Sequence, residues 1–206
     1  MSHIANKYII KKGKFIRNWE RLHQKVHDPW NNKKDHKLHI HFLIADALCK
    51  KFYKKKSSIL DVGASSGYLK NYLKKYKSFK YLGTDISKKA TTNNKDVITD
   101  DIRIFNKNFE KKFDFIFILR TIYYVAPEID KVLKNLKKYL KKNGILIISY
   151  NLKKNSFTNR YLTDVSLRKK LKKIKLVELY TVEVNREIMM NNNGEKHSFF
   201  FFKKVN

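Results

Sequence analysis

Short apolar runs alternate with amphipathic segments over most of the chain, beginning near residue 57. The runs have the length and the β-branched or aromatic composition of buried strands, and the segments between them have the apolar spacing of helices. The expected strands cover residues 59–62, 81–85, 97–99, 113–119 and 144–150, and the expected helices cover 68–76, a short stretch after 87, and 128–140. This alternation predicts an α/β fold with a parallel sheet and right-handed crossovers.

The last part of the chain follows a different pattern. Residues 175–184 and 197–204 are both strand-like, and the stretch 191–195 between them, Asn-Asn-Asn-Gly-Glu, has the composition of a tight turn. Two strands joined in this way form an antiparallel pair. The sheet is therefore expected to hold seven strands, to be mostly parallel, and to end in an antiparallel hairpin.

The residues before the first strand are expected to be helical. One predicted helical face near the N-terminus carries three large apolar side chains, those of Phe15, Trp19 and Leu22. A second helix is expected over residues 38–52. We expect residues 1–55 to form an N-terminal helical lid and residues 56–206 to form one globular core, because no internal repeat or flexible linker divides the chain.

The most informative segment is the turn that follows the first strand of the core. It reads Asp61-Val-Gly63-Ala-Ser-Ser-Gly67 and joins a buried strand to an amphipathic helix. The glycines allow the backbone to approach a ligand closely, and the start of the helix offers free N–H groups. The Asp61 carboxylate would repel a pyrophosphate, so a ligand that carries an ammonium group suits this turn better.

This turn resembles motif I of the class I S-adenosylmethionine (SAM) methyltransferases, whose pattern is Asp/Glu-x-Gly-x-Gly-x-Gly. Ser65 stands in place of the middle glycine. The terminal hairpin strengthens the resemblance, because the class I methyltransferase fold ends in one and ordinary dinucleotide-binding domains lack it. The resemblance implies a Rossmann-like fold, SAM as the cofactor, and cofactor contacts from Asp61, Gly63, Ala64, Ser65 and Gly67.

The resemblance extends to the ends of the second and third strands. Asp85 ends the second strand, where the family uses a carboxylate to accept hydrogen bonds from both ribose hydroxyls, and Ile86 follows it. The third strand leads into Asp100, Asp101 and Ile102, where the family places an aspartate that accepts from the adenine amino group beside an apolar residue. Asp101 with Ile102 is the preferred register, and Asp100 is the alternative.

The fourth strand ends at Leu119, which the resemblance places at the cofactor. Many small-molecule members continue with Ser-Glu-Val-Leu-Tyr-Tyr-Leu, so Tyr123 and Tyr124 match this run, whereas Arg120 replaces its acidic residue. An Asp-Pro-Trp sequence that ends at Trp30 makes the resemblance closest to the nodulation-type sugar N-methyltransferases. The resemblance implies a substrate pocket that contains Trp30, Arg120, Tyr123 and Tyr124.

Four side chains are candidates for a general base, which is needed only where the methyl acceptor must lose a proton. Among Tyr123, Tyr124, His39 and His41, the preferred ones are Tyr124 and His41, and each has a simpler interpretation, Tyr124 as a pocket wall and His41 as a structural histidine. The cluster of His36, His39 and His41 also suggests a metal ion. No carboxylate or thiolate at a suitable spacing completes such a set, so no metal site is expected.

Composition limits the functions that remain. The chain has 206 residues, is 42% hydrophobic, and carries a formal net charge of +29 that comes mainly from lysine. The lysines are interpreted either as solvated residues that reflect an AT-rich genome or as an RNA-binding surface. The leading hypothesis is methylation of an oxygen or nitrogen of a small molecule, with sugars and phosphorylated metabolites as candidates. The alternative is an RNA methyltransferase, and nonspecific RNA binding at low salt is expected in either case.

Other features concern location and redox state. No apolar run approaches the ~18 residues of a membrane-spanning helix, so no membrane partner is expected. The N-terminal residues lack the pattern of a secretory signal, and the single Cys49 excludes a disulfide framework. A cytoplasmic location is therefore expected.

Overall fold

The computed structural model of the protein describes residues 7–12, 14–26, 28–29, 40–52, 54–76, 78–151, 160–185 and 196–205. Seven strands form one sheet in the order β5-β4-β3-β6-β7-β9-β8. Their bounds are β3 Ser58–Val62, β4 Lys80–Asp85, β5 Val97–Thr99, β6 Phe113–Leu119, β7 Leu140–Asn151, β8 Leu176–Asn185 and β9 Lys196–Lys204. The first five strands pair in parallel, whereas β9 pairs antiparallel with both β7 and β8. The predicted seven-stranded fold with its terminal hairpin is confirmed.

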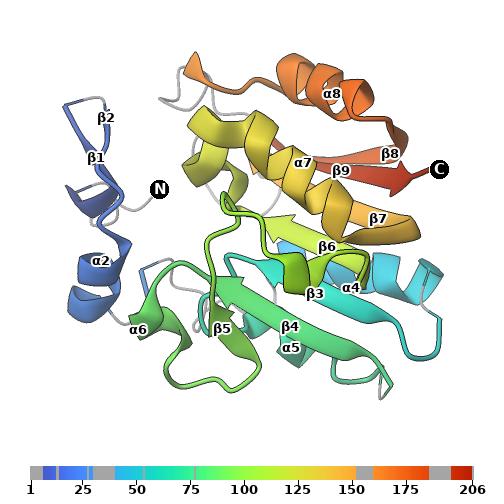
Figure 1. Ribbon diagram of the computed structural model, residues 1–206, viewed down its shortest axis with the longest axis horizontal. Helices are drawn as coiled ribbons and strands as arrows, with labels where there is room; N and C mark the ends of the chain where they lie inside the picture. The colour runs from blue at the N-terminus through green and yellow to red at the C-terminus, as the bar shows by residue number, and fades with distance from the viewer. Residues whose placement is uncertain are drawn as a thin grey trace.

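Helices cover both faces of this sheet, and a small hairpin and one helix lie apart from it at one end (Figure 1). The hairpin is β1 Ile10–Lys11 with β2 Lys14–Phe15, and the helices are α2 Trp19–Lys25, α4 Ile40–Phe52, α5 Tyr68–Leu73, α6 Lys88–Thr91, α7 Ile129–Tyr139 and α8 Asp164–Lys173. Two short 3₁₀ helices, η2 Lys107–Phe109 and η3 Ile122–Glu128, complete the described elements.

The sheet is buried on both faces because its strands carry apolar side chains at successive positions. In β9, Phe200 and Phe202 pack into the cluster under α7 and α8, whereas Phe199 and Phe201 pack into the cluster under α4 and α5. Successive side chains of a strand point to opposite faces, so one apolar run fills two cores. The two cores fix the sheet in place, and the site lies at the carboxyl ends of its parallel strands.

The N-terminal segment differs from the prediction. Phe15 belongs to strand β2 and not to a helix, and α2 begins only at Trp19. The backbone of Arg17 has a φ of 50°, which a helix cannot contain, and the Asn18 side chain accepts a hydrogen bond from the backbone N–H of Arg21 as an N-cap. Residues 7–26, called the arm below, therefore combine a hairpin with a two-turn helix.

Helix α4 also differs from the expected lid. Ala45 and Cys49 lie one turn apart and are buried against the sheet in the same cluster as helix α5. Only the first turn of α4, with His41 and Phe42, reaches the cavity described below. Helix α4 is thus a layer of the core, and the arm is the segment that lies over the ends of the strands.

Helix α8 is not among the helices expected from the sequence. Thr163 and Ser166 form a capping box at its start, and Leu167 and Leu171 are fully buried. Helix α5 is shorter than its predicted range of 68–76 and ends at Leu73.

Candidate functional site

A cavity opens at the carboxyl ends of β3, β4 and β6, where open α/β sheets bind their ligands. The arm covers one side of it with Arg17, Trp19 and His23. The remaining walls contain most of the cofactor residues predicted from the sequence, namely Asp61, Gly63, Ala64, Ser65, Asp85, Ile86, Asp101, Ile102 and Leu119.

The turn after β3 depends on its backbone conformation. Gly63 and Gly67 have φ angles of 73° and 77°, and Ser65 between them has a φ of 51°. A side chain at Gly63 would place its Cβ only 2.3 Å from the Thr121 Oγ1 atom, so this position accepts glycine alone. Ser65 occupies the left-handed conformation that explains why the family pattern has glycine at its position. Gly67 does not line the cavity but begins helix α5 behind it.

Asp61 is a buried carboxyl group at the end of β3. Its Oδ2 atom accepts a hydrogen bond from the Tyr81 hydroxyl at 2.8 Å. Burial raises the pKa of Asp61 to about 7, and the nearby Asp85 charge acts in the same direction, whereas the Tyr81 hydrogen bond opposes both. None of the described lysine or arginine side chains forms an ion pair with Asp61. The group is therefore suited to a cationic ligand that would restore its charge.

Asp85 lies half-buried at the end of β4, and backbone donors fix its orientation. Its Oδ2 atom accepts from the Ser65 N–H at 2.9 Å, and its Oδ1 atom accepts from the Ser87 N–H at 3.0 Å. Burial raises the pKa of Asp85, while these N–H groups and the neighbouring His23 oppose that rise. Each oxygen keeps a lone pair for a further donor, so the carboxylate can accept two hydroxyl groups side by side.

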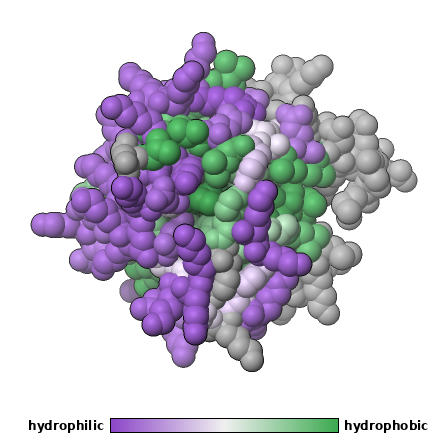
Figure 2. Space-filling view, turned by 90° about the vertical axis from the view of Figure 1, so that its right-hand side faces the viewer, coloured by the Kyte–Doolittle hydropathy of each residue, from purple (hydrophilic) through white to green (hydrophobic). Residues whose placement is uncertain are grey.

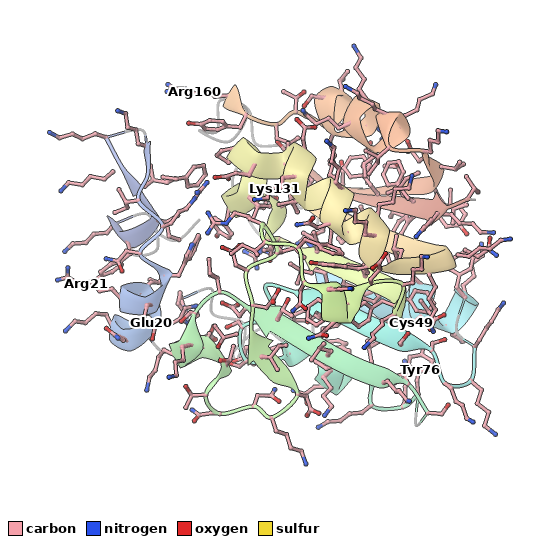
Figure 3. The ribbon with its side chains drawn as sticks, in the orientation of Figure 1. Glu20, Arg21, Cys49, Tyr76, Lys131 and Arg160 are labelled. Atoms are coloured by element: carbon pink, nitrogen blue, oxygen red, sulfur yellow. The ribbon has the colours of Figure 1, made fainter. Side chains whose placement is uncertain are left out.

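The arm is attached to this strand end through Glu20. The Ser87 hydroxyl donates to Glu20 Oε2 at 2.8 Å, and the Lys89 N–H donates to Glu20 at 3.2 Å. Figure 3 shows Glu20 on the side of α2 next to α6, with Arg21 turned away from it. One turn further on, burial lowers the pKa of His23, whereas the charges of Asp85 and Glu20 favour its protonated form.

Glu20 and His23 were missed in the sequence analysis. The signal that could have found them is a pair of polar residues three apart on the helix face that also carries Trp19 and Leu22. Such residues bury polar groups beside an apolar anchor, and they need partners on a neighbouring element.

The two adjacent aspartates after β5 have different partners. Asp101 forms a bidentate ion pair with Arg103, whose Nη2 lies 2.7 Å from Oδ2, and although burial would raise the pKa of Asp101, Arg103 lowers it overall. Asp100 Oδ1 accepts from the Asn106 side chain at 2.9 Å, whereas its Oδ2 is buried and forms no hydrogen bond with any described residue. Burial raises the pKa of Asp100. The alternative register therefore offers the free acceptor.

The end of β6 carries Leu119, Arg120 and Thr121, all of which line the cavity. Arg120 has a φ of 59°, and its N–H donates to the Ser149 hydroxyl of the neighbouring strand at 2.7 Å. A left-handed backbone at an arginine is uncommon and is found mainly where the surrounding structure requires it. Strand β6 thus ends in a fixed bend at the cavity wall.

Two predicted substrate residues on η3 have different positions. Tyr124 lines the cavity and packs edge-on against Trp19 of the arm, with ring centroids 4.7 Å apart. Tyr123 is not among the lining residues and stacks on Tyr150, with ring centroids 5.3 Å apart. Of the two adjacent tyrosines on η3, only Tyr124 lines the cavity.

Of the three histidines in the predicted cluster, the structure describes only His41. His41 is buried, borders the cavity, and packs against Phe199 with ring centroids 5.0 Å apart. His36, His39 and Trp30 lie outside the described residues. Within the described ranges, no group of three or more His, Cys, Asp or Glu side chains is placed to hold a metal ion. The helices described by the structure also include none that is long and apolar enough to cross a bilayer.

Comparison with known proteins agrees with this geometry. A family model described as "Methyltransferase domain" matches residues 33–194. A curated relative named ribosomal protein L11 methyltransferase, from Thermosipho melanesiensis, is 30% identical over 140 residues, which cover 65% of this chain and 53% of the relative. The chain spans about half the length of the curated relatives it matches.

Solved structures give the same fold at low identity. A SAM-dependent methyltransferase from Aquifex aeolicus superposes with a TM-score of 0.62 at 19% identity, over 85% of this chain and all of that chain. Phosphoethanolamine N-methyltransferase 2 of Haemonchus contortus, solved in complex with SAM, superposes with a TM-score of 0.59 at 15% identity over 78% of this chain and 52% of that one. These likenesses concern the fold.

Proposed function

Because the chain belongs to the methyltransferase domain family, we propose that it transfers the methyl group of SAM to an oxygen or nitrogen of a small molecule. The observation that carries this proposal is the convergence of three carboxyl groups, from Asp61, Asp85 and Asp100, on one cavity at the ends of three neighbouring strands. This set matches the donors that SAM presents, namely its ammonium group, its ribose hydroxyls and its adenine amino group.

The parts of SAM can be assigned to residues in order along the sheet edge. Asp61 and the turn through Gly63 would hold the amino-acid end, and the buried carboxyl group would ionise beside the ammonium. Asp85 would accept from both ribose hydroxyls, because its oxygens are already aligned by backbone N–H groups. Ile86 and Ile102 would lie against the adenine ring.

The reaction requires little chemistry from the protein. The sulfonium of SAM makes its methyl group electrophilic, and the acceptor lone pair displaces S-adenosylhomocysteine. Holding the two reactants in line can supply about 7–11 kcal/mol of the barrier. Tyr124 and His41 border the cavity and are the proposed proton acceptors for a substrate that must be deprotonated.

The class of the methyl acceptor is inferred from the arm, which covers one side of the cavity. The arm places Trp19 against Tyr124 across the opening, which suits a small metabolite better than a folded polymer. The resemblance to the sugar N-methyltransferases supports a sugar-like or phosphorylated acceptor. An RNA substrate is supported by the charge of +29, and Figure 2 shows hydrophilic side chains over much of one side of the molecule.

The adenine register can be decided by substitution. We expect Asp100→Asn to weaken SAM binding about tenfold, because it replaces the acceptor that has no described partner. Asp101→Asn should weaken SAM binding less than threefold, since Arg103 already occupies that carboxylate. Calorimetric titration of SAM into both variants measures this difference, and the reverse ranking would restore Asp101 to the adenine.

The attachment of the arm can be tested in the same way. Glu20→Ala removes the acceptor shared by Ser87 and Lys89, so we expect SAM to dissociate roughly tenfold faster. Arg21→Ala is the matched control, because this neighbouring side chain is exposed on the outer side of α2 (Figure 3). Stopped-flow displacement of bound SAM gives the rates. Equal rates for the two variants would mean that the arm does not retain the cofactor.

The proposed function is tested by transfer from methyl-labelled SAM into a fractionated cell extract. Label in the small-molecule fraction supports the proposal and identifies the acceptor. Label in RNA would assign the function to the basic surface, and label in protein would relate the chain to its curated relative in substrate as well. Binding of SAM without transfer to any fraction would contradict methyl transfer to the metabolites tested.

A further inference from the structure

The permanently charged cationic side chains that line the cavity are all arginines. Arg17, Arg103 and Arg120 all line it, and no lysine does so among the described residues. The chain contains 40 lysines and only 7 arginines, so three of its seven arginines meet at one cavity. A genome that favours lysine codons explains the lysines of the surface but not this selection.

Arginine and lysine differ in what they recognise. The planar guanidinium presents parallel N–H groups that match the two oxygens of a carboxylate or phosphate, whereas an ammonium acts as a point charge. A cavity that is lined by three arginines and by none of the described lysines therefore indicates recognition of a planar or tetrahedral oxyanion. SAM itself provides one carboxylate at its amino-acid end, and the nearest assigned residue there is the acidic Asp61.

The three arginines are not equivalent. Arg103 is held by Asp101 in a bidentate pair, which accounts for its presence. Arg17 pairs with Glu128 at 2.5 Å and its guanidinium lies over the Phe15 ring, whereas its Nε is buried without a hydrogen bond to any described residue. Arg17 and Arg120 both have left-handed backbones, with φ of 50° and 59°.

We propose that the methyl acceptor is a small anion, and that Arg120 at the end of β6 and Arg17 of the arm bind its carboxylate or phosphate. This inference rests on the proposed function and names the acceptor class within it. Arg17 and Arg120 both line the cavity, and we assign them to the acceptor because the lining carboxyl groups are already assigned to the cofactor. Because Arg17 belongs to the arm, an anionic acceptor would also help to hold the arm over the cavity.

A second basic surface does not compete with this assignment. Lys111, Lys134, Lys138 and Lys204 line a groove at the C-terminal end of α7. Lys204 donates there to the backbone oxygens of Lys137 and Leu140, and a helix C-terminus favours cations without any ligand. The C-terminus of α7 therefore accounts for the lysines of this groove without a bound anion.

The test uses inorganic phosphate and malonate as probes, titrated by calorimetry into the full chain saturated with S-adenosylhomocysteine. We expect the wild-type protein to bind one of the two at millimolar concentration, and Arg120→Gln and Arg17→Gln to weaken that binding about tenfold or more. Arg120→Lys should restore only part of it. Arg168→Gln is the matched control, since Arg168 pairs with Glu178 and Asp164 outside the cavity.

The outcomes separate the two proposals. Failure to bind S-adenosylhomocysteine contradicts the proposed function itself. Normal cofactor binding together with equal anion binding by Arg120→Gln and wild-type protein overturns the present inference alone. A labelled product from the cell extract that carries neither carboxylate nor phosphate would also overturn it.

Discussion

Replacing Asp85 with alanine is expected to weaken SAM binding by at least about 100-fold while leaving the fold intact. The two ribose hydroxyls would each lose a hydrogen bond to a charged acceptor, worth about 1.5–3 kcal/mol apiece. The carboxylate lies at the floor of an open cavity, so water can reach the Ser65 and Ser87 N–H groups once it is removed. Calorimetric titration gives the affinity, and a thermal unfolding curve reports the fold.

Two further variants make this result specific. Asp85→Asn keeps one acceptor oxygen in the same place and should fall between alanine and wild type. Asp130→Ala is the control, because Asp130 is exposed, pairs with Lys170 and does not line the cavity. If Asp85→Ala leaves the affinity for SAM unchanged, Asp85 does not bind the ribose. The proposed order of SAM contacts along the sheet edge would then lose its central residue.

The strand ends could be predicted because their chemistry is local. Each buried strand is an apolar run, and a polar residue in its last positions, such as Asp61 or Asp85, falls at the carboxyl edge of the sheet by geometry alone. The backbone at Ser65 could also be anticipated, since the pattern it departs from has glycine in a position that proves to be left-handed. This part of the site is specified by residues that adjoin one another in the sequence.

The remaining parts depend on side-chain contacts that form only in the folded chain. The proposed preference for Asp100 over Asp101 rests on Arg103 and Asn106, whose side chains select their partners only after the loop has folded. Tyr123 leaves the cavity because Tyr150 of β7 offers it a stacking partner. The role of the arm rests on the pair formed by Glu20 and Ser87, which are 67 residues apart. Periodicity carries no information about such pairs.

Replacing Asp61 with asparagine is expected to stabilise the cofactor-free protein at pH 8 by up to about 4 kcal/mol. Burial raises the pKa of Asp61 from 3.8 to about 7, and each unit of such a shift corresponds to about 1.4 kcal/mol. The wild-type group favours the folded state most below pH 3.8, where it is protonated in both states, and this contribution is lost as the pH rises through about 7. The amide oxygen of asparagine can still accept from Tyr81 and carries no charge.

The gain in stability should shrink as the pH is lowered from 8 towards 4, because both proteins then carry a neutral group at this position. Urea unfolding of the two proteins across this range measures the difference, and Asp130→Asn serves as an exposed control whose effect should stay near zero. The same substitution should weaken SAM binding, since the ammonium loses its counter-charge, and wild-type affinity for SAM should itself fall as the pH drops below about 7. A variant that is no more stable than wild type at pH 8 would contradict a raised pKa of Asp61 in the cofactor-free protein. An ionised Asp61 destabilises the cofactor-free protein because its charge is buried without a counter-charge. The ammonium group of SAM supplies that counter-charge and removes the destabilisation.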